Sequence, residues 1–414
     1  MAFKLRSVAE PWWNALSEII DCSHVSPPEG LAPLVDRALT PLGITAEVFL
    51  IDLSQRHLRP VRAGAGPALN VEAGVAGRSF RLGEIVAVGN GVPELWVPLV
   101  DGTARLGTVR LTLPAGTDPE DEDLRRRCWQ LVGLLGHLVV AGSAYGDTFH
   151  IAQRARPLSV ASELLWQLLP PLTFATERLV ISAVLQPFDR IGGDGFDYAV
   201  DLQEAFFAIF DAVGHDIQAG LTTALTLAAI RNARRQGATG LEELTSAADE
   251  VIRQEAPGAR FVTAVLARLD VRTGLLHYLN AGHPPPLLLR ASKTVKTLDG
   301  AHRVPLGVRV PGGEPATAGV EQLEPGDRLL LYTDGIVEAR DAAGREFGLD
   351  QLIDLAERSS AAGLPSPETL RRLSHTVQEH QGGELRDDAT LLLVEWSSAG
   401  PRRLLPETAW LRGG

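Results

Sequence analysis

The chain has 414 residues, of which 22% are charged, and its net charge is -12 at pH 7. This length is enough for two or three domains of roughly 150 residues each. The acidic balance disfavours nucleic acid and anionic lipid as partners. Cys22 and Cys128, the two cysteines, are too few for a disulfide framework and lack metal-ligand spacing, as expected in a reducing cytoplasm.

Residues 1–29 are predicted to form an N-terminal helical segment. They contain no long apolar run followed by a small-residue cleavage site, so secretion is not indicated. The most apolar later stretch, WQLVGLLGHLVVAGSAYG, is interrupted by His137 and by glycines, and it falls short of the ~20 apolar residues that a membrane span needs. We therefore expect a cytoplasmic protein without a membrane partner.

Residues 30–118 alternate apolar runs with glycine-marked turns. A helix is predicted at PLVDRALTPLG, and short strands of one antiparallel sheet are predicted at AEVFLIDL, GEIVAVG, LWVPLVDG and RLGTVRLTLP. The pattern GVAGRSFRLGEIVAV followed by LWVPLVDGTARLGTVRLTL resembles a GAF domain, a sensor module found upstream of bacterial signalling enzymes. The resemblance implies an α+β GAF-like sensor domain, and it leaves the ligand unidentified.

Residues 119–172 are predicted to form a helical linker. The segment DPEDEDLRRRCWQLVGLLGHLVVAG begins with an acidic turn, which suits a helix N-terminus. In RARPLSVASELLWQLLPP, apolar side chains at helical spacing form one stripe that Pro170 and Pro171 end. Two interpretations remain open: a helix packed on its own domain, or a signalling helix that joins a homodimer.

Residues 173–397 contain strands separated by glycine and acidic residues, with likely helices between them, and residues 398–414 are predicted to be a loosely held tail. Several of the strands are apolar on both faces and should lie in the interior of stacked sheets. The strongest strand candidates are RLVISAVLQP, EAFFAIFDAVGHD, RFVTAVLARLD, LLHYLNAGHPPPLLLR, DRLLLYTDGIVEAR and DDATLLLVEW.

Four of these strand-like segments end in an aspartate or begin with one: Asp194, Asp211, Asp334 and Asp388. Neighbouring strands can bring such residues to one sheet edge, where like charges are costly unless a cation neutralises them. Carboxylates are typical ligands of Mg²⁺ and Mn²⁺, and two such ions would suit a phosphatase. Taken singly, TDG is most often a turn and DD a solvated cap.

The double glycine of RIGGDGFDYAV can be interpreted through this proposed metal cluster. Gly192 and Gly193 would let the backbone turn tightly enough to aim Asp194 at the metal cluster.

Five motifs stand in a characteristic order: IGGDGFD, DAVGHD, NAGHPPPLLL, EPGDRLLLYTDGIVEAR and DDATLLLV. Together they resemble the PPM-type, metal-dependent serine/threonine protein phosphatases, specifically the bacterial SpoIIE-like subfamily, over about residues 165–397. The resemblance implies an α/β fold, an α-β-β-α sandwich of two antiparallel sheets with flanking helices, with the metal site at one end. It also implies hydrolysis of phosphoserine or phosphothreonine by a metal-bound hydroxide, with two Mn²⁺ or Mg²⁺ ions as cofactors. In related bacterial proteins the phosphorylated protein substrate is an anti-sigma-factor antagonist.

The resemblance also implies roles for individual residues. Asp194 and Asp211 would bind metal and act in catalysis, and the carbonyl of Ala212 would complete the shell. Asp334 and Asp388 would supply the remaining carboxylates, with Asp387 and Asp197 as supporting groups near the ligands.

Two histidines near the motifs have alternative interpretations. His215 would donate a proton to the leaving oxygen, because histidine titrates near neutrality. The favoured alternative is that His215 only orders the loop before the following helix. His283 is interpreted as structural, through hydrogen bonds to its turn.

The sequence departs from the family pattern at Gly195, where an aromatic residue is usual, and at Asp216, where glycine is usual. Asp216 would add charge and remove backbone freedom beside the site. Two rival functions remain: a non-catalytic phosphatase-like signalling module regulated by the sensor domain, and a hydrolase of small phosphoesters.

Overall fold

The protein is described by a computed structural model that covers residues 2–62, 64, 66–89, 91–187, 189–190, 192–214, 216–255, 260–309, 316–383, 385 and 387–409. By the density of its internal contacts the chain divides into two compact units. The first comprises Met1–Ala155 with Arg402–Gly414, and the second comprises Arg156–Pro401. The five-part division expected from the sequence stays a prediction. None of the described helices is long and apolar enough to cross a membrane.

The first unit is built on one antiparallel sheet of six strands in the order β3-β2-β1-β6-β5-β4. Its strands are β1 Thr45–Ile51, β2 His57–Pro60, β3 Leu69–Asn70, β4 Val86–Val88, β5 Glu94–Asp101 and β6 Ala104–Thr112. Its helices are α1 Ala2–Ser23, α2 Leu31–Leu39, α3 Gly74–Leu82, α4 Glu122–Ser143 and α5 Thr148–Gln153, with 3-10 turns η1 Pro28–Gly30, η2 Thr40–Leu42 and η4 Glu407–Ala409.

Helix α4 belongs to the core of this unit. Asp121 caps its N-terminus by accepting a hydrogen bond from the Leu124 amide. Leu131 and Leu135 are fully buried in one apolar cluster with side chains of α1, α2 and the sheet.

Part of the predicted tail is also packed, because Leu404 is buried and its carbonyl approaches Gly83 too closely to admit a Cβ. The tail is thus held more firmly than the sequence predicts, through a contact with a segment distant in sequence.

The second unit contains two further six-stranded sheets, which are almost entirely antiparallel. One has the order β15-β12-β11-β10-β9 with β16 paired to β12, and the other has the order β14-β13-β17-β18-β8-β7. The single parallel pairing among the described strands is β12 with β15. This arrangement confirms the expected α/β class with antiparallel sheets.

The strands of the first of these sheets are β9 Asp194–Val200, β10 Glu204–Ala212, β11 Val262–Asp270, β12 Leu275–Ala281, β15 His302–Arg303 and β16 Gly319–Gln322. Those of the second are β7 Thr173–Ala175, β8 Leu179–Gln186, β13 Leu287–Arg290, β14 Lys293–Thr297, β17 Arg328–Tyr332 and β18 Ala389–Trp396. The helices are α6 Val160–Leu168, α7 Ile217–Arg235, α8 Leu241–Glu255, α9 Asp334–Val337, α10 Gly348–Ala361 and α11 Ser366–His380, followed by the 3-10 turn η3 Pro401–Arg403.

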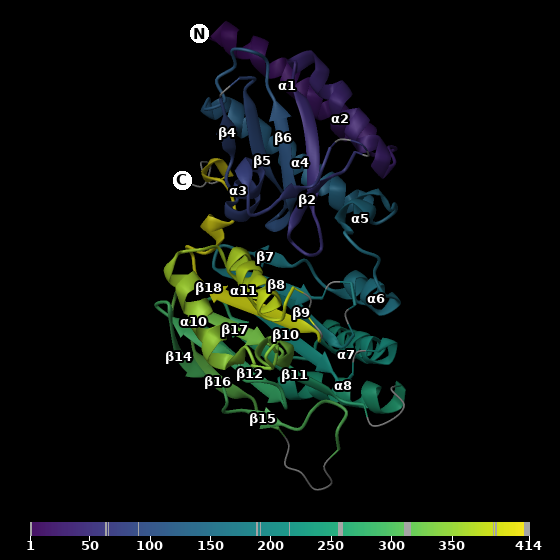
Figure 1. The fold of residues 1–414 in the computed structure, drawn as a ribbon, viewed down its shortest axis with the longest axis vertical. Helices are drawn as coiled ribbons and strands as arrows, with labels where there is room; N and C mark the ends of the chain where they lie inside the picture. The colour runs from purple at the N-terminus through teal and green to yellow at the C-terminus, as the bar shows by residue number, and fades with distance from the viewer. Residues whose placement is uncertain are drawn as a thin grey trace. The chain divides into compact units, whose positions relative to one another are not determined.

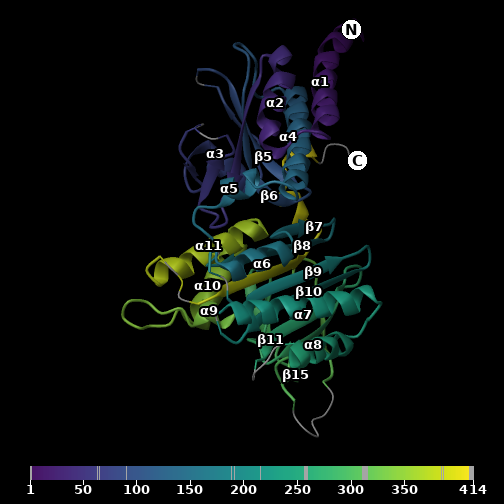
Figure 2. The ribbon, with the colours of Figure 1, turned by 90° about the vertical axis from the view of Figure 1, so that its right-hand side faces the viewer.

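Three apolar clusters show how this unit is layered. One cluster combines side chains of both sheets, including Phe207 on β10 and Leu392 on β18. A second joins β10 and β11 to α7 and α8, which run along that sheet in Figure 2. A third joins β17 and β18 to α10 and α11, which cover those strands in Figure 1. Helix α6 contributes Leu165 to the first cluster, so it packs on its own unit; whether it also forms a dimer contact stays a prediction.

Candidate active site

The four strand-end aspartates lie at one edge of the two sheets of the second unit. Asp194 begins β9 and is paired directly with Asp211 near the end of β10. Asp334 follows β17, and Asp388 precedes β18, its antiparallel neighbour, so these two residues meet at the same end. Register thus forms one pair of aspartates in each sheet, and the packing of the two sheets joins the pairs, bringing Asp388 within hydrogen-bond distance of the Asp194 amide, 194 positions away in the sequence.

The carboxylates of this cluster perturb one another strongly. Burial, followed by the charges of Asp388 and Asp211, raises the pKa of Asp194 well above its ordinary value. Burial and the charges of Asp334, Asp387 and Asp388 raise the pKa of Asp211 to about 7. Burial likewise raises the pKa of Asp334 and of Asp388, and the charge of Asp387 adds to both shifts. Like charges crowded in a partly buried place in this way are a typical setting for a bound cation.

The Asp388 carboxylate is held by the backbone of the double-glycine turn. Its Oδ2 accepts hydrogen bonds from the amides of Gly192 at 2.7 Å, Gly193 at 2.6 Å and Asp194 at 3.3 Å. Successive amides that converge on one oxygen form a concave anion site. The turn therefore orients a carboxylate of the other sheet as well as Asp194.

Two motif glycines are required by close approach of backbone segments. A Cβ on Gly193 would overlap the carbonyl oxygen of Ala212, and one on Gly335 would overlap the carbonyl oxygen of Asp388. Neither glycine has a left-handed φ, so steric exclusion is the reason for both. Gly335 is the glycine of TDG, a motif that by itself suggests only a turn. In the structure this glycine lets the start of α9 pack against the backbone of Asp388, directly before β18.

His283 connects the two sheets close to the acidic edge. Its Nδ1 lies 2.8 Å from Thr263 Oγ1, and its Nε2 lies 3.1 Å from the carbonyl oxygen of Tyr332. A carbonyl only accepts, so Nε2 carries the proton and Nδ1 accepts from the Thr263 hydroxyl. Burial lowers the pKa of His283 to about 3, which keeps the ring neutral. Thr263 is paired with Asp211 in the sheet, and these contacts agree with the structural role expected for His283.

Asp216 was expected to add charge and remove backbone freedom beside the site, but in the structure it caps a helix and forms an ion pair. It caps α7 with φ -97°, a conformation that does not require glycine, and accepts a hydrogen bond from the Ala219 amide at 2.8 Å. Arg260 forms hydrogen bonds to both of its oxygens, at 3.2 and 3.0 Å. These contacts, with Arg260 first, lower the pKa of Asp216. Its charge is thus compensated by Arg260 and by the start of the helix.

The expectation that Asp197 supports the ligands is wrong. Side chains alternate along a strand, and Asp197 is three positions from Asp194, so the two point to opposite faces of the sheet. Asp197 is 1% exposed and is bound by Arg231 and Arg234 of α7. On the same face, Gly195 lies against Thr223 of α7, where a Cβ would approach the threonine methyl to 2.8 Å.

An open cavity of about 390 Å³ adjoins the acidic cluster. Asp387 and Asp388 line one part of it, and Ser159, Asp216 and Arg190 line others. Of the described lining residues, Arg190 alone is cationic, and the sequence analysis did not single it out. The sequence feature that could have pointed to Arg190 is its position four residues before Asp194, within FDRIGGD. Nothing else in the local sequence distinguishes it from an ordinary surface arginine.

The donor set fits Mg²⁺ or Mn²⁺ in chemistry, because it consists of carboxylates that raise one another's pKa values, with Asp194 and Asp388 buried. In the described part of the chain, however, no group of three or more His, Cys, Asp or Glu side chains is arranged closely enough to hold a metal ion. The assignment of Asp194, Asp211, Asp334 and Asp388, with the Ala212 carbonyl, as ligands thus stays a prediction. His215 lies outside the described residues.

Comparison with known proteins identifies relatives of the second unit. Residues 203–397 match the family model described as Stage II sporulation protein E (SpoIIE). The phosphoserine phosphatase RsbU of Bacillus subtilis (strain 168) is 25% identical over 221 residues, which cover 53% of this chain and 63% of the relative. The phosphoserine phosphatase RsbP of the same organism is 26% identical over 223 residues, covering 53% of this chain and 53% of the relative. The match thus spans less than two thirds of either relative.

Among solved structures, the SiaA-PP2C domain of Pseudomonas aeruginosa is similar to this chain, with 24% identity and a TM-score of 0.48. The similarity covers 57% of this chain and 94% of that domain.

Proposed function

We propose that this protein is a metal-dependent protein serine/threonine phosphatase in bacterial signalling, because residues 203–397 match the SpoIIE family model and the similar proteins RsbU and RsbP are phosphoserine phosphatases. The observation that carries the proposal is the meeting of Asp194, Asp211, Asp334 and Asp388 at one sheet edge beside an open cavity. The layering of two sheets between helices supports the finer assignment of the fold as an α-β-β-α sandwich.

The proposed cofactors are two Mn²⁺ or Mg²⁺ ions held by Asp194, Asp211, Asp334, Asp388 and the Ala212 carbonyl. When bound, such ions neutralise phosphoryl charge and make water a stronger nucleophile near neutral pH. The pKa of Asp211, raised to about 7, means that proton release would accompany metal binding in neutral solution. The Gly192 and Gly193 amides keep the Asp388 carboxylate in place before any ion binds.

Arg190 is proposed to bind the phosphoryl group of the substrate. It lines the cavity together with Asp387 and Asp388, and a guanidinium is well suited to phosphate oxygens. A dianionic phosphate would otherwise face only carboxylates among the charged lining groups that the structure describes. His215 remains a proposed proton donor to the leaving serine or threonine oxygen.

The proposed substrate is a phosphorylated anti-sigma-factor antagonist, by analogy with the phosphoserine phosphatases RsbU and RsbP. The first unit, with its six-stranded sheet and helices, is proposed to be a GAF-like sensor domain, and the predicted helical linker to support a homodimer. An alternative function is a non-catalytic signalling module.

The deciding experiment measures Mn²⁺-dependent hydrolysis of an aryl phosphate and of a phosphoserine protein by the full chain. We expect turnover that Asp211→Asn or Asp334→Asn abolishes, while Asp299→Asn, which changes an exposed aspartate outside the cavity and the proposed ligand set, retains it. Mn²⁺ binding is followed separately by calorimetry. Bound Mn²⁺ without turnover in folded protein would favour the non-catalytic module.

A further inference from the structure

A second cavity of about 450 Å³ lies beside β9, the edge strand of its sheet. Asp197 and Tyr198 of β9 line it together with Arg231, Arg234 and Arg235 at the end of α7. Asp197 is three positions from Asp194, so the two side chains point to opposite faces of the strand. None of the described residues that line this cavity belongs to the acidic cluster.

The charged groups of this cavity are out of balance. Arg231 donates to Asp197 Oδ1 from Nε at 3.0 Å and from Nη2 at 2.6 Å, and Arg234 Nη2 donates to Oδ2 at 2.9 Å. Both oxygens of the one lining carboxylate are therefore engaged. The described lining groups comprise three arginines and one aspartate, a local excess of positive charge in a chain whose net charge is -12.

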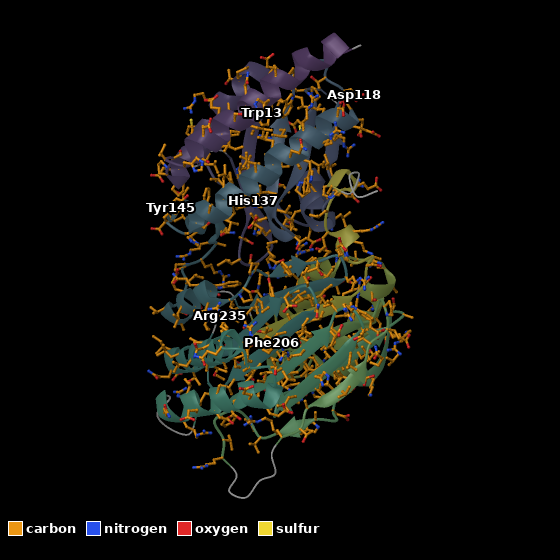
Figure 3. All side chains as sticks on the ribbon, turned by 180° about the vertical axis from the view of Figure 1, so that it is seen from behind. Trp13, Asp118, His137, Tyr145, Phe206 and Arg235 are labelled. Carbon is orange, nitrogen blue, oxygen red and sulfur yellow. The ribbon has the colours of Figure 1, made fainter. Side chains whose placement is uncertain are left out.

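Guanidinium donors remain after these contacts. Each arginine carries five N–H donors, of which Arg231 uses two and Arg234 uses one on Asp197. The Nε of Arg234 is buried without a hydrogen-bond partner. Arg235 is exposed and has no acceptor among the described residues. Figure 3 labels Arg235 and Phe206, the aromatic residue whose ring lies 4.6 Å from the Arg234 guanidinium carbon.

The surroundings of Arg234 agree with this excess of cations. Burial lowers the pKa of Arg234, the charge of Asp197 opposes the shift, and the charges of Arg231, Arg235 and Arg268 add to it. Arg231 and Arg234 link α7 to β9 through Asp197, whereas Arg235 makes no such contact with Asp197. Basic residues in the last turn of α7 also stabilise the helix through its dipole, and this stabilisation would exist without a cavity beside them.

We propose that this cavity is a binding site for a small ligand that carries a phosphate-type oxyanion. Arginine donors in a fork match the oxygens of such a group. The cavity volume lies within the range of about 300 to 1,000 Å³ that is typical of small-molecule sites. Leu168, Leu169 and Pro170 supply an apolar wall, which would suit an organic portion of the ligand.

The test uses the full chain in EDTA, so that divalent ions at the acidic edge cannot recruit the probe. Pyrophosphate is titrated calorimetrically at constant ionic strength, into the native chain and into the Arg235→Gln, Arg253→Gln and Arg190→Gln variants. Arg253 is an exposed arginine of α8 outside the cavity, so its variant is the control for the loss of one positive charge. ADP provides a second probe with the same diphosphate on an organic group.

We expect saturable binding that weakens about tenfold or more in Arg235→Gln, as the loss of a charge-assisted contact predicts, and is unchanged in the other two variants. ADP should bind at least as tightly as pyrophosphate and show the same dependence on Arg235. Loss of binding in Arg190→Gln would place the anion at the acidic cavity and overturn the proposal. Absence of saturable binding, or equal binding in all variants, would also overturn it. None of these outcomes depends on phosphatase turnover.

Discussion

Thr333 and Asp194 join the two sheets of the second unit at their acidic edge, with 2.8 Å between Thr333 Oγ1 and Asp194 Oδ2. Thr333 lies at the end of β17, directly before Asp334, and Asp194 begins β9 of the other sheet. The same hydroxyl oxygen accepts a hydrogen bond from the Thr390 amide at 2.9 Å. One threonine therefore sets the positions of three segments that carry proposed ligands.

Thr333→Val is expected to weaken metal binding without unfolding the protein. The change keeps the shape of the side chain but removes the donor to Asp194 and the acceptor for Thr390. Loss of such a supporting partner typically lowers metal affinity about 10- to 100-fold. The measurement is the Mn²⁺ concentration that gives half-maximal turnover, with Thr333→Ser as the matched control that keeps the hydroxyl. Identical Mn²⁺ dependence in all three proteins would contradict this role.

Gly335→Ala is expected to destabilise the second unit and to disturb the hydrogen bonds that the Gly192 and Gly193 amides donate to the Asp388 carboxylate. An added Cβ would overlap the Asp388 carbonyl oxygen and lie 2.9 Å from its carbon, so the start of α9 must move. Forced overpacking of this kind costs about 1 to 3 kcal/mol. Urea unfolding measures the loss. Gly89→Ala is the control, because an added Cβ there would meet nothing within 4 Å; a similar loss in both variants would refute the steric argument.

His283→Gln is expected to change the pH dependence of stability. The folded-state pKa of His283, about 3, is below the unfolded value near 6.5, so the neutral ring stabilises the fold fully above pH 6.5. That contribution falls as the pH drops from 6.5 towards 3, because the unfolded chain binds the proton more readily.

The stability advantage of native protein over His283→Gln should therefore shrink by about 1.4 kcal/mol between pH 7.5 and pH 5.5. Urea unfolding of both proteins at the two pH values, in EDTA, measures this change. His277→Gln serves as the control, because His277 is exposed on β12. A pH-independent difference between native protein and His283→Gln would show that His283 is not buried in its neutral form.

Arg190→Gln is expected to raise the KM for a phosphoserine protein about tenfold or more while bound Mn²⁺ is unchanged. The reason is that Arg190 alone among the described lining residues of the acidic cavity offers a cation to the phosphoryl group. Steady-state kinetics at saturating Mn²⁺ measures the effect. Arg190→Lys keeps the charge but loses the paired guanidinium donors, so its KM should lie between those of the native protein and Arg190→Gln. An unaltered KM in Arg190→Gln would exclude the contact.

Much of the site could be predicted from local sequence because its features are local. Alternating apolar residues predict strands, and Asp194, Asp211, Asp334 and Asp388 stand at strand ends whatever the rest of the chain does. The antiparallel order of those strands then places Asp194 beside Asp211 in one sheet and Asp334 near Asp388 in the other, whereas the meeting of the two pairs depends on how the sheets pack. The motifs around them also sufficed to indicate the family that residues 203–397 match.

Contacts between segments distant in sequence were decided only by the tertiary structure. Gly335 looks like a turn residue until the Asp388 carbonyl is placed against it, and the partners of Asp197 appear only once α7 packs its arginines against β9. Asp216 finds Arg260, 44 residues away, and the Gly193 amide finds Asp388, 195 residues away. Local spacing determines which face of a strand or helix a residue occupies, whereas its partner depends on how the sheets and helices pack, and no local pattern encodes that.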